Sequence, residues 1–477
     1  MSFSDNHVDY SQEGLEEYAR ELINKNLEEE ESSRTSVCLA IAGGGGYAIA
    51  TLAATPGASS MLLEGTVLYD RKSFRSYVGL PSHTTDFRYS SLNAAKLASE
   101  AALKRALDYR SSNLRLMNGC VGIGCASALV SSSSPDSVKG YGYIVATRSD
   151  GCRLALNVTL ASKKDIQSRG RKEEDIFIGH LVLRAIELIR HAQNEQQIIR
   201  ETETDAGDAI TEKWELTPAL SRLDEENEKD VPMVAAELLL SGDSLAAVLL
   251  PMYKEGRPVS FRLLEFPIVP RGSFIFPGSF NPPHVGHIAL AEAAIKTAMS
   301  KLDRFTHVPE PPVLMEISLT NADKPPIDPS DVSQRLNKFL ELPDLPEQWG
   351  VLLTRAPLFA EKVSVFHDCI LDKAEGFFPK MSFVIGTDTM VRILNPKYYG
   401  NDESAMYEAI RSMNSVHFVV GGRLEQNKSS SGPPRFISGA EELVDLPADI
   451  QGMFTIIKEE DFRVDVSSSE IRQHGSA

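Results

Sequence analysis

The sequence predicts an α/β protein made of two α/β domains. Short apolar runs alternate with segments of helical apolar spacing from residue 36 to about residue 200, and the alternation resumes at residue 272. A stretch that is acidic and poor in large apolar side chains separates the two regions. Because strands that alternate with helices are typical of layered α/β folds, each region is expected to form a domain of its own.

The first domain is expected over residues 34–200, after a polar N-terminal helix or tail at residues 1–33. The apolar run at 36–42 meets four glycines at 43–46, as a buried strand does when it ends in a tight turn. Further strands are expected at 65–70 and 142–147, and helices at 91–109 and 174–192.

The second domain is expected over residues 272–477. Residues 201–231, rich in Asp, Glu and Thr, are predicted to form an acidic linker, and residues 232–271 a connecting segment. A helix is expected at 287–299. The strands of this domain are expected at 274–278, 313–319, 382–386, 416–422 and 454–458.

Length and composition exclude some classes of protein. The 477 residues suggest about three domains, or two with insertions. With 42% apolar and 24% charged residues, the chain has an ordinary globular composition and is not disordered throughout. Its 66 acidic residues exceed the 49 basic ones and give a net charge of −17, so a general nucleic-acid-binding surface is not expected.

The cysteines and the N-terminus indicate a cytoplasmic protein, with the nucleus as a second compartment. The five cysteines are odd in number and lack zinc-site spacing, which favours reduced thiols. No apolar stretch approaches the ~20 residues of a membrane span, so no membrane partner is expected. The polar, acidic N-terminus has neither signal-peptide nor transit-peptide features.

The strongest chemical signal is the segment GSFNPPHVGH at residues 278–287. It follows an expected strand and precedes an expected helix, and Gly278 permits close approach of the backbone to a ligand. The N–H groups of the turn and the positive end of the helix dipole point to one place, which suits a phosphate. His284 and His287 can both face that place and donate hydrogen bonds to phosphoryl oxygens.

This segment resembles the (H/T)xGH signature of the nucleotidyltransferase superfamily, and its GSFNP form is similar to that of the nicotinamide-nucleotide adenylyltransferases. A second family motif, ISSTxIR, is matched by VSSSEIR at residues 466–472. The resemblance covers roughly residues 272–477. It implies a Rossmann-like parallel sheet with the nucleotide at the carboxyl ends of the strands.

The resemblance also implies a reaction and the residues that perform it. A substrate phosphate attacks the α-phosphorus of ATP and pyrophosphate leaves, which requires positioning and charge stabilisation. The implied catalytic residues are His284 and His287, which bind the triphosphate and the transition state, and Arg472, which holds the β- and γ-phosphates with the serines beside it. The implied nucleotide-binding residues are Gly278, Ser279, Phe280, Asn281, Gly286, Gly386, Asp388, Ser467, Ser468 and Ser469.

Three basic residues are weaker candidates for binding the substrate. Lys324, in NADKPPI, stands where the family often places a basic residue beside the substrate phosphate. Arg335 and Arg423 are further candidates of this kind. The alternative for each of the three is an ordinary surface charge. Mg²⁺ is expected to bind as its complex with ATP, since the sequence shows no carboxylate cluster that would form a separate metal site.

The first domain resembles the C-terminal, nicotinamide-nucleotide deamidase domain of CinA proteins. That family opens its site with Glu-Ser-Cys-Thr-Gly-Gly, whose serine is the nucleophile, whereas Ala42 stands at the serine position here. Tyr69 matches a family tyrosine, but Phe74 replaces the family lysine five residues later. Since hydrolysis requires both nucleophile and activator, no deamidase activity is expected. A structural, oligomerising or ligand-sensing role is left for this domain.

The expected function is adenylyl transfer from ATP to nicotinamide or nicotinate mononucleotide, giving an NAD-type dinucleotide and pyrophosphate. One alternative is nucleotidyl transfer from CTP or ATP to another phosphate ester. The other is a regulatory protein that binds nucleotides without turnover. The expected partners are ATP and a mononucleotide, and a homo-oligomer is a further expectation because CinA-like domains often form oligomers.

Overall fold

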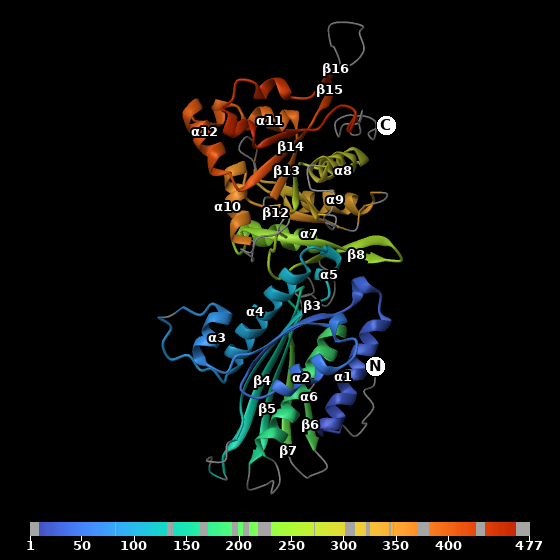
Figure 1. Ribbon diagram of the computed structural model, residues 1–477, viewed down its shortest axis with the longest axis vertical. Coiled ribbons are helices and arrows are strands. Elements are labelled where there is room, and N and C mark those ends of the chain that lie inside the picture. The colour runs from blue at the N-terminus through green and yellow to red at the C-terminus, as the bar shows by residue number, and fades with distance from the viewer. Residues whose placement is uncertain are drawn as a thin grey trace. The chain divides into compact units, whose positions relative to one another are not determined.

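The computed structural model describes residues 9–463 except 82, 131–134, 136, 163–169, 193–198, 204–208, 218–229, 271, 301–310, 321–324, 343–344, 347, 370–380 and 426–434. The chain forms two compact units, each with its own sheet (Figure 1). Unit 1 comprises Met1–Arg110 and Leu116–Glu226, and unit 2 comprises Ser111–Arg115 and Asn227–Ala477. The α/β fold class is thereby confirmed.

Unit 1 contains a seven-stranded mixed sheet in the order β2-β1-β3-β4-β5-β7-β6. Its strands are β1 (Ser36–Ala42), β2 (Leu62–Val67), β3 (Cys120–Ala128), β4 (Lys139–Arg148), β5 (Arg153–Ser162), β6 (Ile199–Glu203) and β7 (Ala209–Thr217). Strand β1 lies between β2 and β3 and is parallel to both, whereas the remaining pairs are antiparallel. Strands β2 and β3, which follow β1 in the chain, therefore lie on opposite sides of β1 in the sheet.

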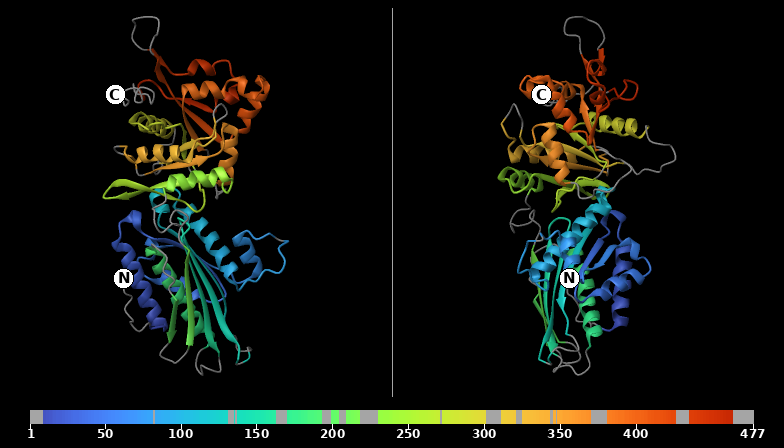
Figure 2. Two further views of the ribbon diagram at one scale, coloured as in Figure 1. Left: turned by 180° about the vertical axis from the view of Figure 1, so that it is seen from behind. Right: turned by 60° about the vertical axis from the view of Figure 1, so that its left-hand side comes forward.

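Helices cover both faces of this sheet (Figure 2). They are α1 (Gln12–Glu28), α2 (Gly46–Ala54), α3 (Arg71–Val78), α4 (Leu92–Arg110) and α6 (Arg171–His191). The short helix α5 (Leu114–Met117) has residues in both units. The core formed with α1, α2 and α6 contains Val121, Ile123 and Cys125 of β3. On the other face, a Cβ at Gly122 or Gly124 would lie within 2.1 Å of α4 carbonyl oxygens. These two glycines therefore permit direct packing of the helix backbone on the strand.

The structure corrects part of the prediction that residues 201–231 form an acidic linker. Residues up to Glu203 complete β6, and residues 209–217 form β7, which pairs with β5. The acidic composition conceals a pattern typical of strands, because Ile210, Trp214 and Leu216 are separated by even numbers of residues in the sequence. Leu216 packs against the unit 1 core.

Unit 2 contains an eight-stranded sheet in the order β17-β14-β13-β10-β11-β12-β8-β9. Its strands are β8 (Ala246–Lys254), β9 (Arg257–Leu263), β10 (Phe274–Pro277), β11 (Val313–Ser318), β12 (Trp349–Thr354), β13 (Met381–Gly386), β14 (Val416–Gly421) and β17 (Phe454–Ile456). The six strands from β10 onward are parallel to one another, and β8 and β9 form an antiparallel edge hairpin beside β12. In chain order the parallel strands read 3-2-1-4-5-6, the order of doubly wound sheets, with the switch between β10 and β13.

The helices of unit 2 are α7 (Val231–Ser241), α8 (Val285–Met299), α9 (Pro329–Leu340), α10 (Phe359–Cys369), α11 (Thr387–Ile393), α12 (Glu403–Ser412) and α13 (Ala448–Gln451). A small hairpin joins β15 (Arg423–Glu425) and β16 (Arg435–Ile437). The connecting segment predicted over 232–271 belongs to this unit, since it supplies α7, β8 and β9.

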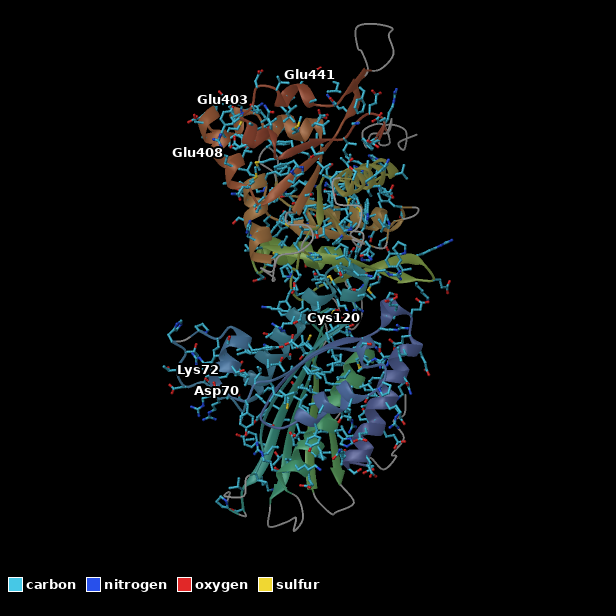
Figure 3. The ribbon with its side chains drawn as sticks, viewed as in Figure 1. Asp70, Lys72, Cys120, Glu403, Glu408 and Glu441 are labelled. Atoms are coloured by element: carbon cyan, nitrogen blue, oxygen red, sulfur yellow. The ribbon has the colours of Figure 1, made fainter. Side chains whose placement is uncertain are left out.

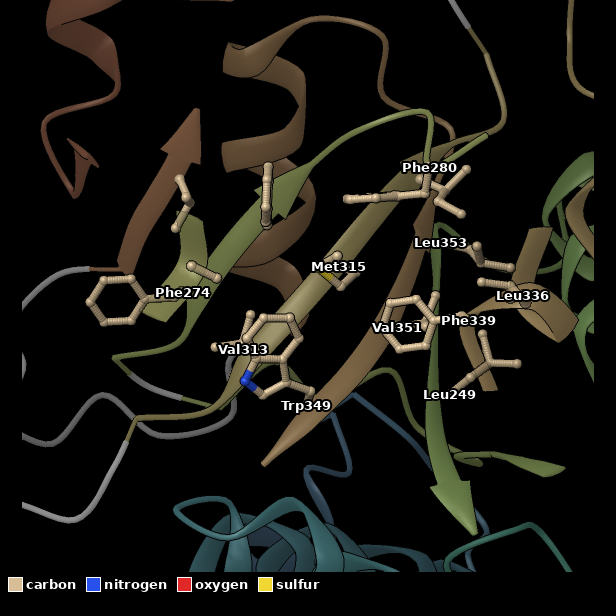
Figure 4. Close-up of a cluster of buried hydrophobic side chains, with 14 of the residues drawn as sticks. Leu249, Phe274, Phe280, Val313, Met315, Leu336, Phe339, Trp349, Val351 and Leu353 are labelled. Carbon is tan, nitrogen blue, oxygen red and sulfur yellow. The ribbon is translucent and has the colours of Figure 1, made fainter. Parts of the chain in front are cut away.

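The core under α7, α8 and α9 contains Phe274, Met315, Trp349 and Phe280 among its buried side chains (Figure 4). On the opposite face, Phe383 stacks on Phe418 with ring centroids 5.5 Å apart. Both faces of the sheet are therefore buried, as its near-continuous apolar strands require. None of the helices in the described part of the chain has the length and hydrophobicity of a membrane span.

Candidate active site

The turn between β10 and α8 lies at the switch point of the unit 2 sheet. Gly278 donates its N–H to the carbonyl oxygen of Glu316 on β11 over 3.0 Å, which ties the start of the turn to the neighbouring strand. Phe280 has a positive φ of 42°, and its side chain is buried against Phe276. A Cβ at Gly278 would lie 2.7 Å from the Phe280 ring, so only glycine fits there.

The two histidines of the turn face each other across the first turn of α8. The His284 backbone N–H donates to Nδ1 of His287 over 3.1 Å, and the ring centroids lie 3.7 Å apart. Since Nδ1 of His287 accepts a hydrogen bond, the neutral ring holds its proton on Nε2. Nδ1 of His284 is buried without a hydrogen-bond partner among the described residues. Each ring thus has polar capacity left for a ligand.

Burial keeps both histidines neutral at neutral pH. Desolvation, and secondarily the neighbouring His284, lower the pKa of His287 from 6.5 to about 3. Desolvation also lowers the pKa of His284. In this state His287 is a neutral donor at the positive end of the α8 dipole.

Acid is expected to destabilise unit 2 through His287. The unfolded chain binds a proton near pH 6.5 that the folded unit binds only near pH 3. Stability therefore falls with decreasing pH between these values, by at most ~1.4 kcal/mol per pH unit for this group. The check is urea unfolding at pH 7, 6 and 5, followed by Trp349 fluorescence in a Trp214→Phe background. His287→Gln is expected to flatten the pH dependence, and equal slopes with and without His287 contradict the prediction.

Other predicted site residues lie around this turn. Arg335, on α9, donates from Nη1 to the carbonyl oxygen of Ser279 over 3.1 Å, which brings this weak sequence candidate to the turn. Ser279 is exposed, Asn281 is half-buried and Gly286 is buried in the first turn of α8. One guanidinium and two imidazoles are thus grouped at one end of the sheet.

A second group of predicted residues lies at the end of β13, the strand beside β10. Gly386 ends β13, and Asp388 lies in the first turn of α11. The Asp388 carboxylate pairs with the Arg423 guanidinium over 3.1 Å, with both side chains about half exposed. Because parallel neighbours end at one edge of a sheet, this group leaves the sheet on the same side as the β10 turn.

The remaining site predictions lie outside the described residues. They are Lys324, Ser467, Ser468, Ser469 and Arg472. Within the described ranges there is no group of three or more His, Cys, Asp or Glu residues that could hold a metal ion.

Sequence reasoning missed a buried ion pair beneath the turn. Nζ of Lys362 on α10 and Oγ1 of Thr354 each donate to Oε1 of Glu316 over 2.6 Å. The Glu316 and Lys362 side chains are 1% and 5% exposed. The one signal in the sequence is Glu316 itself, a charged residue within the otherwise apolar strand β11. Glu316 also accepts from Gly278 through its backbone, so the pair braces the strand end that holds the turn.

Unit 1 has a cavity of about 670 Å³ at the carboxyl ends of β1 and β3. Asp70, labelled in Figure 3, follows β2 and caps α3 by accepting from the Lys72 N–H over 2.8 Å. The Arg71 guanidinium lies 5.5 Å from the centroid of the Tyr89 ring. The cationic and aromatic residues of the lining are Arg71, Arg88, Arg171, Tyr69, Phe74, Phe87, Tyr89 and Tyr141.

The glycine turn beside this cavity is occupied by side chains of the protein itself. The N–H groups of Gly45 and Gly46 donate to Oδ1 of Asp175 on α6, the second over 3.2 Å. The N–H of Gly44 donates to Oγ of Ser127 over 2.5 Å. A turn with several converging N–H groups is suited to an anion. Here the Asp175 carboxylate occupies the position that a bound anion would take.

Unit 1 is expected to release no ammonia from nicotinamide mononucleotide. Ala42 provides no nucleophile, and Phe74, at the position of the family lysine, is 1% exposed and packs on Phe87. Ala42→Ser alone is expected to remain inactive, because Asp175 still occupies the glycine N–H groups. The expectation is contradicted by a release of ammonia that exceeds the protein-free blank and that disappears when Tyr69 is replaced by Phe.

Comparison with known proteins finds a similarity in sequence to a curated protein. No protein-family model matches the chain. A putative nicotinamide mononucleotide adenylyltransferase of Schizosaccharomyces pombe is 25% identical over 152 residues, which are 31% of this chain and 51% of that protein. The chain therefore spans about half the length of this curated relative.

The solved structures that match include proteins of the CinA superfamily. The competence/damage inducible protein CihA of Agrobacterium tumefaciens is 21% identical, with a TM-score of 0.26, over 37% of this chain and 93% of that one. A CinA superfamily protein of Klebsiella pneumoniae is 13% identical, with a TM-score of 0.27, over 37% and 95%. The chain is thus similar in sequence to a putative nicotinamide mononucleotide adenylyltransferase, and in structure to proteins of the CinA superfamily.

Proposed function

We propose that unit 2 transfers the adenylyl group of ATP to nicotinamide or nicotinate mononucleotide, giving an NAD-type dinucleotide and pyrophosphate. The observation that supports this most directly is the pair of neutral histidines at the start of α8, at the switch point of a doubly wound sheet. The sequence match to a putative enzyme of this kind agrees with the choice of acceptor.

In the proposed reaction, an oxygen of the mononucleotide phosphate attacks the α-phosphorus of ATP. The bond to the oxygen that bridges the α- and β-phosphorus breaks, and its electron pair leaves with pyrophosphate. No group of the protein forms a covalent bond. Mg²⁺ accompanies ATP and offsets the charge of the leaving pyrophosphate.

The protein contributes preorganised donors to this step. The Nε2–H of His287 points a fixed dipole at the phosphoryl oxygens, and the helix end adds its partial positive charge. The Arg335 guanidinium, held against the Ser279 carbonyl, lies where it can attract a substrate phosphate to the turn. These local positive groups act within a chain of net charge −17.

The test is a pyrophosphate-release assay on the full chain with Mg²⁺, ATP or CTP, and a panel of acceptors. The panel contains nicotinamide mononucleotide, nicotinate mononucleotide, phosphopantetheine and phosphocholine. Turnover with ATP and a pyridine mononucleotide supports the proposal. Turnover only with CTP or another phosphate ester overturns the choice of substrate. ATP binding without turnover for any pair leaves a nucleotide-binding regulatory protein.

A further inference from the structure

The last residues of β10 are held in the sheet by β11. The register of β10 with β13 runs through Phe274 and Ile275, whereas its register with β11 continues to Pro277. Successive N–H groups along a central strand alternate between its two neighbours. Phe274 and Gly278 donate to carbonyl oxygens on the β11 side, and Pro277, whose nitrogen would face β13, carries no hydrogen. The hydrogen bond from Gly278 to the Glu316 carbonyl oxygen therefore ties the start of the turn to the sheet.

The Glu316 side chain is fixed by donors from two other elements. Nζ of Lys362 on α10 and Oγ1 of Thr354, the last residue of β12, each lie 2.6 Å from the same carboxylate oxygen. The Thr354 hydroxyl group accepts from the N–H of Ala356 over 3.4 Å, so its own proton is directed to Glu316. Because Glu316, Thr354 and Lys362 are all buried, water does not compete for these bonds. The carboxylate thus has a position that β12 and α10 set together.

Stability alone does not account for a buried ion pair at this place. Replacement of such a pair by apolar side chains of similar volume is often neutral or stabilising, because removing two charges from water costs about as much as their attraction returns. The neighbours of Glu316 on its face of the sheet include Leu314 and Leu352, so an apolar side chain would suit the position. A charged pair differs from an apolar contact in being directional, and it therefore fixes one arrangement of the strand end.

We propose that Lys362 and Thr354 are positioning residues for the turn between β10 and α8 and act on it through Glu316. They fix the Glu316 residue, and with it the carbonyl oxygen that holds the Gly278 N–H. This inference rests on the proposed function of unit 2, in which donors of this turn and of α8 bind the triphosphate. Such donors act only when they are held in place beforehand, and a displacement of about 1 Å can lower a rate about 10²-fold.

The test replaces the whole network by apolar side chains in the triple variant Lys362→Met/Glu316→Leu/Thr354→Val. Urea unfolding measures stability, calorimetry measures binding of inorganic tripolyphosphate, and the pyrophosphate-release assay measures kcat. The triple variant is expected to be about as stable as the wild type, because no buried charge or hydroxyl group of the network is left unpaired. It is expected to bind tripolyphosphate about 10-fold more weakly and to lower kcat by about 10-fold or more.

Two control variants separate positioning from folding. Thr354→Ser keeps the hydroxyl group and is expected to stay within about twofold of the wild type in both tripolyphosphate binding and kcat. Val416→Ala removes buried methyl groups at the start of β14, at the end of the sheet opposite to the turn. It is expected to lower stability and to leave the tripolyphosphate affinity and the kcat of the folded protein unchanged.

Wild-type tripolyphosphate affinity and wild-type kcat in the triple variant overturn the inference. So does a loss of activity that only follows the loss of folded protein, in the triple variant and in Val416→Ala alike. A wild-type chain that binds tripolyphosphate but converts no pair of substrates defeats the proposed function alone, and the binding comparison still decides the role of Lys362. A wild-type chain that shows neither turnover nor tripolyphosphate binding defeats both.

Discussion

Replacement of His287 by alanine is expected to lower the kcat of pyrophosphate release by about 10²–10³-fold. This is the usual cost of removing one preorganised donor from a developing negative charge. The neutral His287 ring is already oriented by the His284 N–H, so its Nε2–H pays no reorganisation cost during the reaction. The pyrophosphate-release assay measures the effect. His367→Ala, which removes an exposed histidine on α10 paired with Ser415, is the matched control and is expected to be near wild type.

His287→Glu separates catalysis from helix capping. A glutamate at the third helical position accepts from the N-cap N–H, as in a capping box, and its charge suits a helix start. The variant is therefore expected to retain α8, at some cost to the stability of unit 2, because the desolvation that keeps His287 neutral also penalises a carboxylate there. It is expected to lose turnover, because the carboxylate repels the triphosphate. Wild-type activity in His287→Glu would show that the ring serves only as a cap for the His284 N–H.

Replacement of Lys362 by methionine is expected to destabilise unit 2 by about 3–5 kcal/mol. The change leaves the Glu316 carboxylate 1% exposed and without its cation, and the remaining Thr354 hydroxyl supplies a single hydrogen bond. The loss is measured by urea unfolding at pH 7, followed by Trp349 fluorescence in the Trp214→Phe background. Lys296→Met, which breaks an exposed ion pair with Asp461, is the control and is expected to cost under about 1 kcal/mol.

The double variant Lys362→Met/Glu316→Gln tests whether the cost arises from the unpaired charge. A neutral glutamine still accepts from the Thr354 hydroxyl, so the double variant is expected to recover most of the stability lost by Lys362→Met. A double variant that is as unstable as the sum of the two single changes would mean that the ammonium stem, and not the ion pair, stabilises α10.

The sequence predicted features whose cause is local. The apolar run of β1, its four-glycine turn, and the strand–turn–helix from β10 to α8 follow from neighbouring residues, and the structure has all three. Strands β6 and β7 were missed because the acidic composition of these segments outweighs the alternation of Ile210, Trp214 and Leu216 in the sequence. The alternation is present in the sequence, but the acidic residues around it are typical of a linker.

The contacts that complete each site join residues far apart in the chain. Asp175 reaches a turn 129 residues away, and Arg335 reaches the Ser279 carbonyl 56 residues away. Lys362 pairs with Glu316 across 46 residues. Such partners depend on the order of strands in the sheet, which no single segment contains. The roles of Lys324 and of the serine-rich motif at 466–472 stay predictions, since these residues lie outside the described ranges.

The occupied glycine turn of unit 1 has a consequence for how that unit depends on its surroundings. A loop that is ordered by a free ligand gains stability in proportion to the logarithm of the ligand concentration. The Asp175 carboxylate is attached to the same chain, so its effective concentration at Gly45 and Gly46 is set by α6 and does not vary. The order of this turn is therefore expected not to depend on the supply of small anions.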